Sequence, residues 1–295
     1  MSLDDELSDL LIISLEQAVS APYCGLLLAS AGARVIKVER PEGDFARSYD
    51  NSINGKSAIF AWLNRGKESI SLDLKNKTDK KIFKNMLKKA DVFLSNLAPG
   101  SLEKLELGYQ QVKTLNPKLI FCKITGYGNS KLAHSKKAYD FLIQAESGLC
   151  SVTGTEKNPS KVGISITDLS TGLTAYSAIL RGIIKRSKTK KGISISISMF
   201  DVMADWMNMP LLAHRYMGGT PKRNGMKHSF IAPYGTFKCK NNDEILISIQ
   251  NNREFEVFCK NILKNQNLFK NPKFQDNPNR YKNRHELDEI INSCF

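Results

Sequence analysis

The sequence predicts an α/β protein with a large domain built on a parallel sheet and a smaller α+β domain. Over the first 200 residues, short apolar segments typical of buried strands alternate with longer helix-like segments. The connections between the strand-like segments are long enough to hold a helix, as parallel neighbours require. The texture changes after 218–227, a segment rich in Gly, Pro and Lys that predicts a linker. We therefore expect a large domain at 1–200, a helix and linker at 201–227, and a small domain at 228–295.

The first strand is predicted at 10–15 (LLIISL), a short apolar run bounded by polar residues. A compact helix follows at 22–33, because Pro22 is tolerated in a first turn and Gly32 follows the last apolar turn. The same alternation then predicts strands at 35–38, 69–74, 92–94 and 119–124, and helices at 77–89 and 102–115.

The later segments continue with a helix at 172–184, rich in Ala, Gly and Ile, and a basic turn at 185–191. After them come a strand at 193–198, a helix from 199 to about 217, small-domain strands at 234–239 and 244–249, and helices at 253–263 and 284–292. In open α/β sheets ligands bind at the carboxyl ends of the strands, so we expect the functional site there.

The formal net charge of +14 favours anionic partners such as a polyphosphate cofactor. The lysines are spread along the chain among many Asn and Ile, without a zinc finger, an RNP-type aromatic motif or a tight basic stripe, so we expect no nucleic-acid partner. No apolar run reaches about 18 residues and the first residues are acidic, so we expect a cytoplasmic protein without a membrane partner. The six cysteines form no CxxC pair, and we expect neither disulfides nor a metal site.

Short motifs with a general mechanism are missing from the sequence: it has no GxGxxG, no P-loop, no GxSxG and no HExxH. Five longer stretches in a fixed order carry the functional signal instead. The first is 17–25 (QAVSAPYCG) with 31–41 and 43–44, the second is 64–67 (NRGK) with 69–75, and the third is 90–100 with 105–108. The fourth is 126–128 with 138–148, which begins with the run Ala138-Tyr139-Asp140, and 151–154, and the fifth is 163–172 (GISITDLSTG).

Together these stretches closely resemble the class III coenzyme A transferases, the CaiB/BaiF family that includes formyl-CoA transferase and alpha-methylacyl-CoA racemase. The resemblance runs from about residue 10 to the end of the chain. It implies a large Rossmann-like domain, a smaller domain and an interlocked homodimer, with acyl-CoA and carboxylic acids as substrates, coenzyme A as co-substrate and no metal. Family members usually continue further, so the chain is expected to end before the family's C-terminal return segment.

Asp168 matches the family's nucleophile, the carboxylate that attacks the thioester carbonyl. Capping of the following helix is the commoner fate of an Asp in this context, and it is compatible with the nucleophilic role. A carboxylate at a helix N-terminus is expected to stay ionised, as covalent catalysis requires. We also expect Gly163 and Gly172 to let the backbone approach the acyl group closely.

Two further catalytic residues are implied by the resemblance. Gln17, after the first strand, would donate a hydrogen bond to the reacting carbonyl and stabilise the oxyanion. Tyr139 occupies the position where the racemase branch carries a catalytic His. A phenol with a pKa of about 10 is a poor base at neutral pH, which points away from racemisation and towards transfer.

Coenzyme A binding is also assigned by resemblance. Arg40, Lys75, Lys104 and Lys137 would surround the phosphates and adenine, although solvated surface charge is an equally ordinary role for the lysines. Leu72–Lys75 and Asn96–Ala98 would form the nucleotide slot. The full set is Ala18, Arg40, Leu72, Asp73, Leu74, Lys75, Asn96, Leu97, Ala98, Lys104, Lys137, Ala138 and Asp140.

Residues beyond this set bear on the acid that is used. His228 and Tyr234 would border the acyl pocket or serve in packing, and no glycine-rich loop follows them, so formyl or oxalyl specificity is not expected. The leading prediction is a transferase that moves coenzyme A to small carboxylic acids, of which dicarboxylic acids are the expected class. The alternatives are an acyl-CoA racemase or isomerase, and a non-catalytic, truncated CoA-binding subunit.

Overall fold

The computed structural model describes residues 5–128, 130, 132–133 and 135–295, which fall into two compact units. The first unit holds the chain up to Leu149 and then Val162–Met209. The second holds Cys150–Lys161 and Pro210–Phe295. The chain therefore visits the second unit briefly at 150–161 before it returns to the first.

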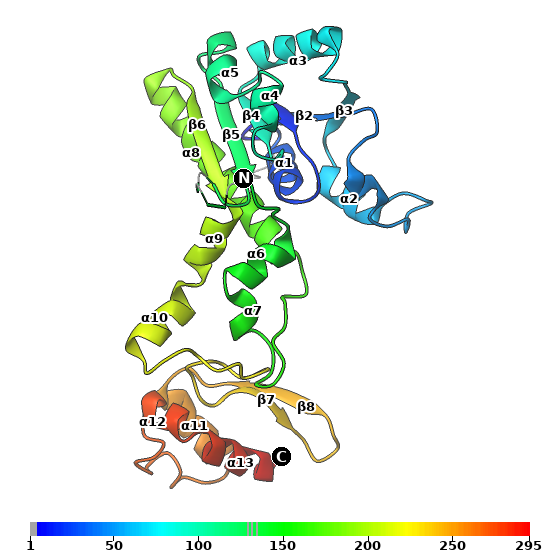
Figure 1. Cartoon of the computed structure of the whole chain (residues 1–295). Helices are drawn as coiled ribbons and strands as arrows, with labels where there is room; N and C mark the ends of the chain where they lie inside the picture. The colour runs from blue at the N-terminus through cyan, green and yellow to red at the C-terminus, as the bar shows by residue number, and fades with distance from the viewer. Residues whose placement is uncertain (1–4, 129, 131, 134) are drawn as a thin grey trace. The chain divides into compact units, whose positions relative to one another are not determined.

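A six-stranded sheet forms the centre of the first unit, in the order β3-β2-β1-β4-β5-β6, with β3 and β6 at opposite edges (Figure 1). All neighbouring strands pair in parallel, which confirms the predicted parallel sheet. The strand order reverses between β1 and β4, and such a switch point is where open α/β sheets bind ligands. The strands are β1 (Leu11–Leu15), β2 (Arg34–Glu39), β3 (Glu68–Ser71), β4 (Val92–Ser95), β5 (Ile120–Thr125) and β6 (Ile193–Ser198).

Helices cover both faces of this sheet. Successive strand residues point to opposite sides, and apolar residues of the buried strands therefore form a core on each face. Ile12 packs in one core with Leu28 and Ile179, whereas Ile13 packs in the other with Phe83 and Leu87. The helical segments from Ser20 to Trp206 are α1 (Ser20–Ser30), the short η1 (Phe45–Ser48), α2 (Ala58–Asn64), α3 (Lys77–Lys89), α4 (Ser101–Lys104), α5 (Tyr109–Leu115), α6 (Asp140–Glu146), α7 (Leu149–Val152), α8 (Ile166–Thr189) and α9 (Met199–Trp206).

Two predicted helices are interrupted. The helix expected at 102–115 is divided into α4 and α5, because Glu106 has a left-handed φ of 60° and cannot continue the first helix. The helix expected from 199 to about 217 is divided at Met207 into α9 and α10 (Asn208–Tyr216).

Other predicted boundaries were also wrong, and the basic turn expected at 185–191 is helical as far as Thr189, where α8 ends. The strand expected at 69–74 ends at Ser71, and the chain then turns through Leu72 and Leu74, which are buried. The helix expected from Gly172 begins at Ile166, which places Asp168 inside its first turn.

The second unit combines a two-stranded antiparallel sheet with helices, as expected of a small α+β domain. Its core contains Phe255 and Leu287, and the guanidinium of the buried Arg280 lies 4.6 Å from the centre of the Phe255 ring. Its elements are β7 (Tyr234–Lys238), β8 (Glu244–Ser248), α11 (Asn252–Asn261), α12 (Asn277–Lys282) and α13 (Arg284–Cys294). Across the described part of the chain, no helix has the length and apolar character needed to cross a membrane.

Candidate active site

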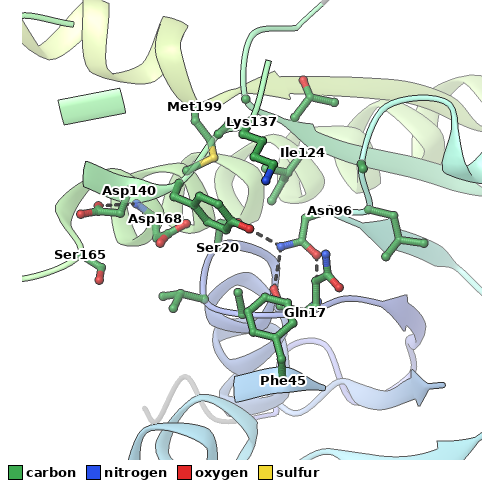
Figure 2. Close-up of a pocket in the computed structure, with 18 of the residues that line it drawn as sticks. Gln17, Ser20, Phe45, Asn96, Ile124, Lys137, Asp140, Ser165, Asp168 and Met199 are labelled. Atoms are coloured by element: carbon green, nitrogen blue, oxygen red, sulfur yellow. Dashed lines mark hydrogen bonds between the residues drawn. The ribbon is translucent and has the colours of Figure 1, made fainter. Parts of the chain in front are cut away.

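The switch point of the sheet opens into a cavity of about 600 Å³. Gln17 enters it just after β1, Asn96 just after β4 and Thr125 at the end of β5. Asp168 enters it from the first turn of α8. Figure 2 shows Asp140 and Asp168 on one side of the cavity, with Gln17 and Asn96 on another. The topology therefore gathers side chains from distant parts of the sequence around one space.

A second cavity of about 220 Å³ adjoins the first, since Gln17 and Leu97 line both. Its walls combine the apolar side chains of Leu72 and Leu74 with the cationic side chains of Arg40 and Lys75. An apolar slot rimmed by positive charge is suited to a flat heterocycle that carries phosphate groups.

The residues assigned in the sequence to catalysis or to coenzyme A binding divide between these two cavities, except for Lys104. Lys104 lies on α4 and lines neither cavity. The larger cavity is lined by Gln17, Ala18, Asn96, Leu97, Ala98, Lys137, Ala138, Tyr139, Asp140 and Asp168, and the smaller by Arg40, Leu72, Asp73, Leu74 and Lys75.

Asp168 is partly buried and is not the capping residue of α8, since that position belongs to Ser165. Burial and the nearby charge of Asp140 raise the pKa of Asp168 to about 7, although a hydrogen bond from the Ser20 hydroxyl partly offsets them. The expectation of a fully ionised carboxylate was therefore wrong near neutral pH. Loss of water around the carboxylate outweighs the favourable field of the helix N-terminus.

The two glycines that flank Asp168 have different surroundings. A Cβ added to Gly172 would lie only 2.5 Å from the backbone oxygen of Ser20, so this glycine allows α8 to pack closely against α1. A Cβ added to Gly163 would meet no atom within 4 Å in the described part of the chain. Gly172 therefore allows the close approach of α8 and α1, the helices that carry Asp168 and Ser20.

The loop after β1 is held by hydrogen bonds from two directions. Asn96 accepts from the Gln17 N–H at 2.9 Å and donates to the Gln17 carbonyl at 2.8 Å and to the Ser20 hydroxyl at 3.2 Å (Figure 2). Asp44 accepts from the N–H of Ala18 at 3.1 Å, where the backbone has a left-handed φ of 62°. These contacts fix the backbone that presents Gln17 to the cavity.

Buried ion pairs hold Asp44, which accepts a hydrogen bond from this loop, and Glu16, which directly precedes it. The ammonium of Lys37 lies 2.7 Å from Asp44 and 3.7 Å from Glu16, and that of Lys67 lies 2.6 Å from Glu16. All these side chains are almost fully buried. Burial alone would raise the pKa of Glu16, but the two ammonium groups outweigh it and lower that pKa.

Several cavity-lining residues were missed in the sequence. Ser20 belongs to the first quoted motif without a role assigned to it, and Tyr49 and Ile59 lie in a segment without strong periodicity. The side chains that were missed are Val19, Ser20, Phe45, Tyr49, Ile59, Pro99, Ile124, Thr125, Ser135, Lys136, Ser165 and Met199. Only contact between distant segments could have identified them.

His228 and Tyr234 belong to the second unit, where their rings stack with centroids 4.9 Å apart. Nδ1 of His228 accepts hydrogen bonds from the N–H groups of Phe230 and Ile231, each at 3.1 Å. These contacts give both rings a packing role within that unit. Among the described residues, no group of three or more His, Cys, Asp and Glu could hold a metal ion.

Comparison with known proteins identifies the family. A model of CoA-transferase family III matches residues 7–295. Succinyl-CoA:glutarate CoA-transferase of Mus musculus is 36% identical over 289 residues, which cover 96% of this chain and 65% of that protein. Acetyl-CoA:oxalate CoA-transferase of Acetobacter aceti is 34% identical over 290 residues, covering 97% of this chain and 74% of that protein.

The fold is shared with solved structures. A CaiB/BaiF family protein from Brucella suis superimposes with a TM-score of 0.84 at 32% identity, over 99% of this chain and 78% of that one. The chain spans less than two thirds of the length of the mouse relative. The resemblance inferred from the five sequence stretches is confirmed, and the chain belongs to the class III CoA-transferase family, also called CaiB/BaiF.

Proposed function

We propose that this chain carries the catalytic site of a CoA transferase that passes coenzyme A between small dicarboxylic acids, with Asp168 as the covalent nucleophile. The observation that carries the proposal is the Asp168 carboxylate in the wall of the larger cavity, which adjoins a second cavity at Gln17 and Leu97. A nucleophile beside a long two-part cleft is what a thioester with an extended nucleotide tail requires.

Coenzyme A would span both cavities. Its adenine would enter the slot at Leu72 and Leu74, with the phosphates near Arg40 and Lys75. The pantetheine arm would then pass Gln17 and reach the thioester beside Asp168 in the larger cavity. Lys137 lines that cavity as well and would add positive charge for an anionic substrate.

The first half of the reaction forms a covalent enzyme intermediate. An oxygen of Asp168 attacks the donor thioester carbonyl, the C–S bond breaks, and the coenzyme A thiolate leaves an aspartyl–acyl anhydride. The thiolate then attacks the aspartyl carbonyl and releases the donor acid, which leaves an aspartyl-CoA thioester. Gln17 would donate a hydrogen bond to the oxyanion that develops in each addition.

The second half reverses the sequence with the acceptor acid. Its carboxylate attacks the aspartyl thioester, the thiolate leaves, and a new anhydride forms. The thiolate attacks the acceptor acyl carbonyl, which yields the new acyl-CoA and restores the Asp168 carboxylate. Every step exchanges one activated acyl bond for another, so no further energy source is required.

The dicarboxylic class rests on the names of the relatives, which pair coenzyme A with glutarate and oxalate. To test it, the protein is incubated with succinyl-CoA and either glutarate, oxalate or butyrate, and new acyl-CoA is measured by mass spectrometry. We expect transfer to at least one dicarboxylate, little transfer to butyrate, and loss of transfer in Asp168→Asn. The matched control Asp201→Asn, an exposed first-turn residue of α9, should retain wild-type transfer.

The other outcomes would contradict the proposal. Exchange of solvent deuterium at an acyl α-carbon without transfer would indicate a racemase or isomerase. Tight binding of coenzyme A with no turnover on any acid would indicate a binding subunit. Undiminished transfer by Asp168→Asn would exclude this residue as the nucleophile.

A further inference from the structure

Asp140, the first residue of α6, joins α6 to the beginning of α8. Its Oδ1 accepts hydrogen bonds from the N–H of Thr167 at 2.8 Å and, more weakly, from the N–H of Asp168 at 3.4 Å. The Thr167 hydroxyl also donates to the Asp140 carbonyl at 3.3 Å. Asp140 therefore contacts the backbone of the proposed nucleophile and of the residue before it.

This carboxylate takes the place of an ordinary helix cap. The first N–H groups of an α-helix lack partners within the helix and are usually satisfied by the side chain at the capping position. In α8 that position is Ser165, whose side chain makes no capping bond to any residue that the structure describes. The cap comes instead from Asp140, a residue 28 positions earlier than Asp168.

Gln144, one turn further along α6, fixes the orientation of Asp140. Its Nε2 donates to Oδ2 of Asp140 at 2.7 Å, while its Oε1 accepts from the N–H of Val162 at 2.9 Å. Gln144 is fully buried, so reversing its amide would leave both partners unsatisfied. The donor and acceptor ends of the Gln144 amide are therefore fixed by Val162 and Asp140. As a result, both carboxylate oxygens of Asp140 accept hydrogen bonds.

The same geometry keeps a negative charge beside Asp168. Burial and the charge of Asp140 together raise the pKa of Asp168 to about 7. The other titratable groups that line the cavity around Asp168 are Tyr139, Lys136 and Lys137 from the segment before α6, and Tyr49 after η1. Lys136 is paired with Glu146 at 2.8 Å, and burial, together with the nearby charges of Asp44 and Asp168, raises the pKa of Tyr49.

We propose, on the basis of the proposed function in which Asp168 is acylated, that Asp140 is a positioning residue for the Asp168 carboxylate. Asp140 also supplies a negative charge that repels the ionised Asp168, and acylation of Asp168 removes this repulsion. When an Asp168 oxygen forms its bond to the thioester carbon and the C–S bond breaks, the negative charge moves from Asp168 to the departing thiolate. The charge beside Asp140 then disappears. Repulsion that weakens the ionised starting state therefore favours the covalent intermediate.

The test is Asp140→Asn, which keeps the size and one acceptor oxygen but removes the charge. Covalent coenzyme A on the peptide that contains Asp168 is measured by mass spectrometry after rapid quenching of a mixture with succinyl-CoA, over a series of pH values. On the acid side of the pH profile, the rate of adduct formation falls as Asp168 is protonated. We expect the midpoint of this fall to lie about one pH unit lower in Asp140→Asn, because a like charge raises a carboxyl pKa. It should stay above the ordinary carboxyl range, since burial remains. The rate above neutral pH should fall roughly three- to tenfold, because a less basic carboxylate is a weaker nucleophile.

A second variant separates aim from charge. Gln144→Leu leaves the Asp140 charge in place but removes the bond that orients it, so the rate should fall while the midpoint changes by less than about half a pH unit. Asp201→Asn is the control for loss of one acidic group, and it should alter neither quantity. If Asp140→Asn does not fold in a thermal melt, an unchanged rate in Gln144→Leu overturns the positioning role by itself.

The outcomes distinguish this inference from the proposed function. Adduct formation by the wild type with an unchanged midpoint and rate in Asp140→Asn overturns the inference and leaves the function standing. Absence of any adduct in the wild type contradicts both. A rate loss in Asp140→Asn without a midpoint shift overturns the role of the charge.

Discussion

Asn96 and Gln17 hold each other by two reciprocal hydrogen bonds, one in each direction between a side-chain amide and a backbone peptide. The same Asn96 amide donates to the Ser20 hydroxyl, which partly offsets the raised pKa of Asp168. The end of β4 therefore orients both the loop after β1 and the hydroxyl beside the proposed nucleophile. This connection makes Asn96 a sensitive position for the whole site.

Asn96→Asp should damage both stability and activity. The new oxygen would face the Gln17 carbonyl where the Asn96 amide now donates, so one hydrogen bond becomes a repulsive contact. We expect a loss of about 1–3 kcal/mol in the free energy of unfolding, measured by chemical denaturation. The transfer rate should fall at least about tenfold, because Gln17 and Ser20 are no longer held. Asn267→Asp, an exposed site in the second unit, is the control, and equal behaviour of the two variants would contradict this role.

The buried ion pairs should matter far more than an exposed one. Lys67→Met would leave the fully buried Glu16 carboxylate without its 2.6 Å partner, at a cost of about 3–5 kcal/mol. Arg34→Met breaks a pair with Glu68 that is also close, at 2.7 Å, but more than half exposed, so it should change stability far less. Chemical denaturation of both variants checks the contrast. Similar losses in the two would show that burial does not set the cost.

Gly172→Ala tests the close approach of α8 to α1. The added methyl group would conflict with the backbone oxygen of Ser20, so the helices must separate. Although alanine favours the helix, we expect a net loss of about 1–3 kcal/mol and slower turnover, because Ser20 moves away from Asp168. Gly163→Ala has open space around it in the described part of the chain and serves as the matched control. If Gly172→Ala is as stable and active as Gly163→Ala, the two helices tolerate separation.

The regular elements were predictable because their signals are local. The helix expected at 77–89 and the strand expected at 193–198 match α3 and β6 residue for residue, since apolar periodicity and flanking polar residues mark both. The division of 102–115 was missed because it depends on one left-handed residue, Glu106, whose identity carries no strong signal for that conformation.

The site was predictable only where family motifs reach it. Asp168, Gln17 and Asn96 stand in quoted motifs and line the larger cavity. The roles of Gly172 and Asp140 depend on contacts of α8 with α1 and α6, which join residues far apart in the sequence. The ionisation of Asp168 was misjudged for the same reason, because burial and the neighbouring carboxylate are properties of the folded chain.

The raised pKa of Asp168 should cost stability as pH rises. Its ordinary pKa of about 3.9 in the unfolded chain becomes about 7 in the folded protein. Between these values the folded state binds more protons than the unfolded state, so the wild type loses stability as pH increases through that window. Asp168→Asn does not titrate. After allowance for solvent screening, we expect it to be more stable than the wild type by roughly 1–3 kcal/mol above neutral pH.

Chemical denaturation of the wild type and Asp168→Asn over a pH series provides the check. The difference between them should grow from acid to neutral pH and then level off. A difference that is constant with pH would mean that the Asp168 carboxylate is not perturbed by folding.

The most direct measurement follows oxygen from the acceptor acid. Each proposed turnover leaves one carboxylate oxygen of the acceptor on the aspartyl side chain, because the anhydride opens at the acceptor acyl carbonyl. After turnover with succinyl-CoA and a heavy-oxygen-labelled dicarboxylate, the peptide that contains Asp168 should become heavier and all other peptides should not. Turnover that leaves this peptide unlabelled, or that labels a different carboxylate, would contradict Asp168 as the covalent nucleophile.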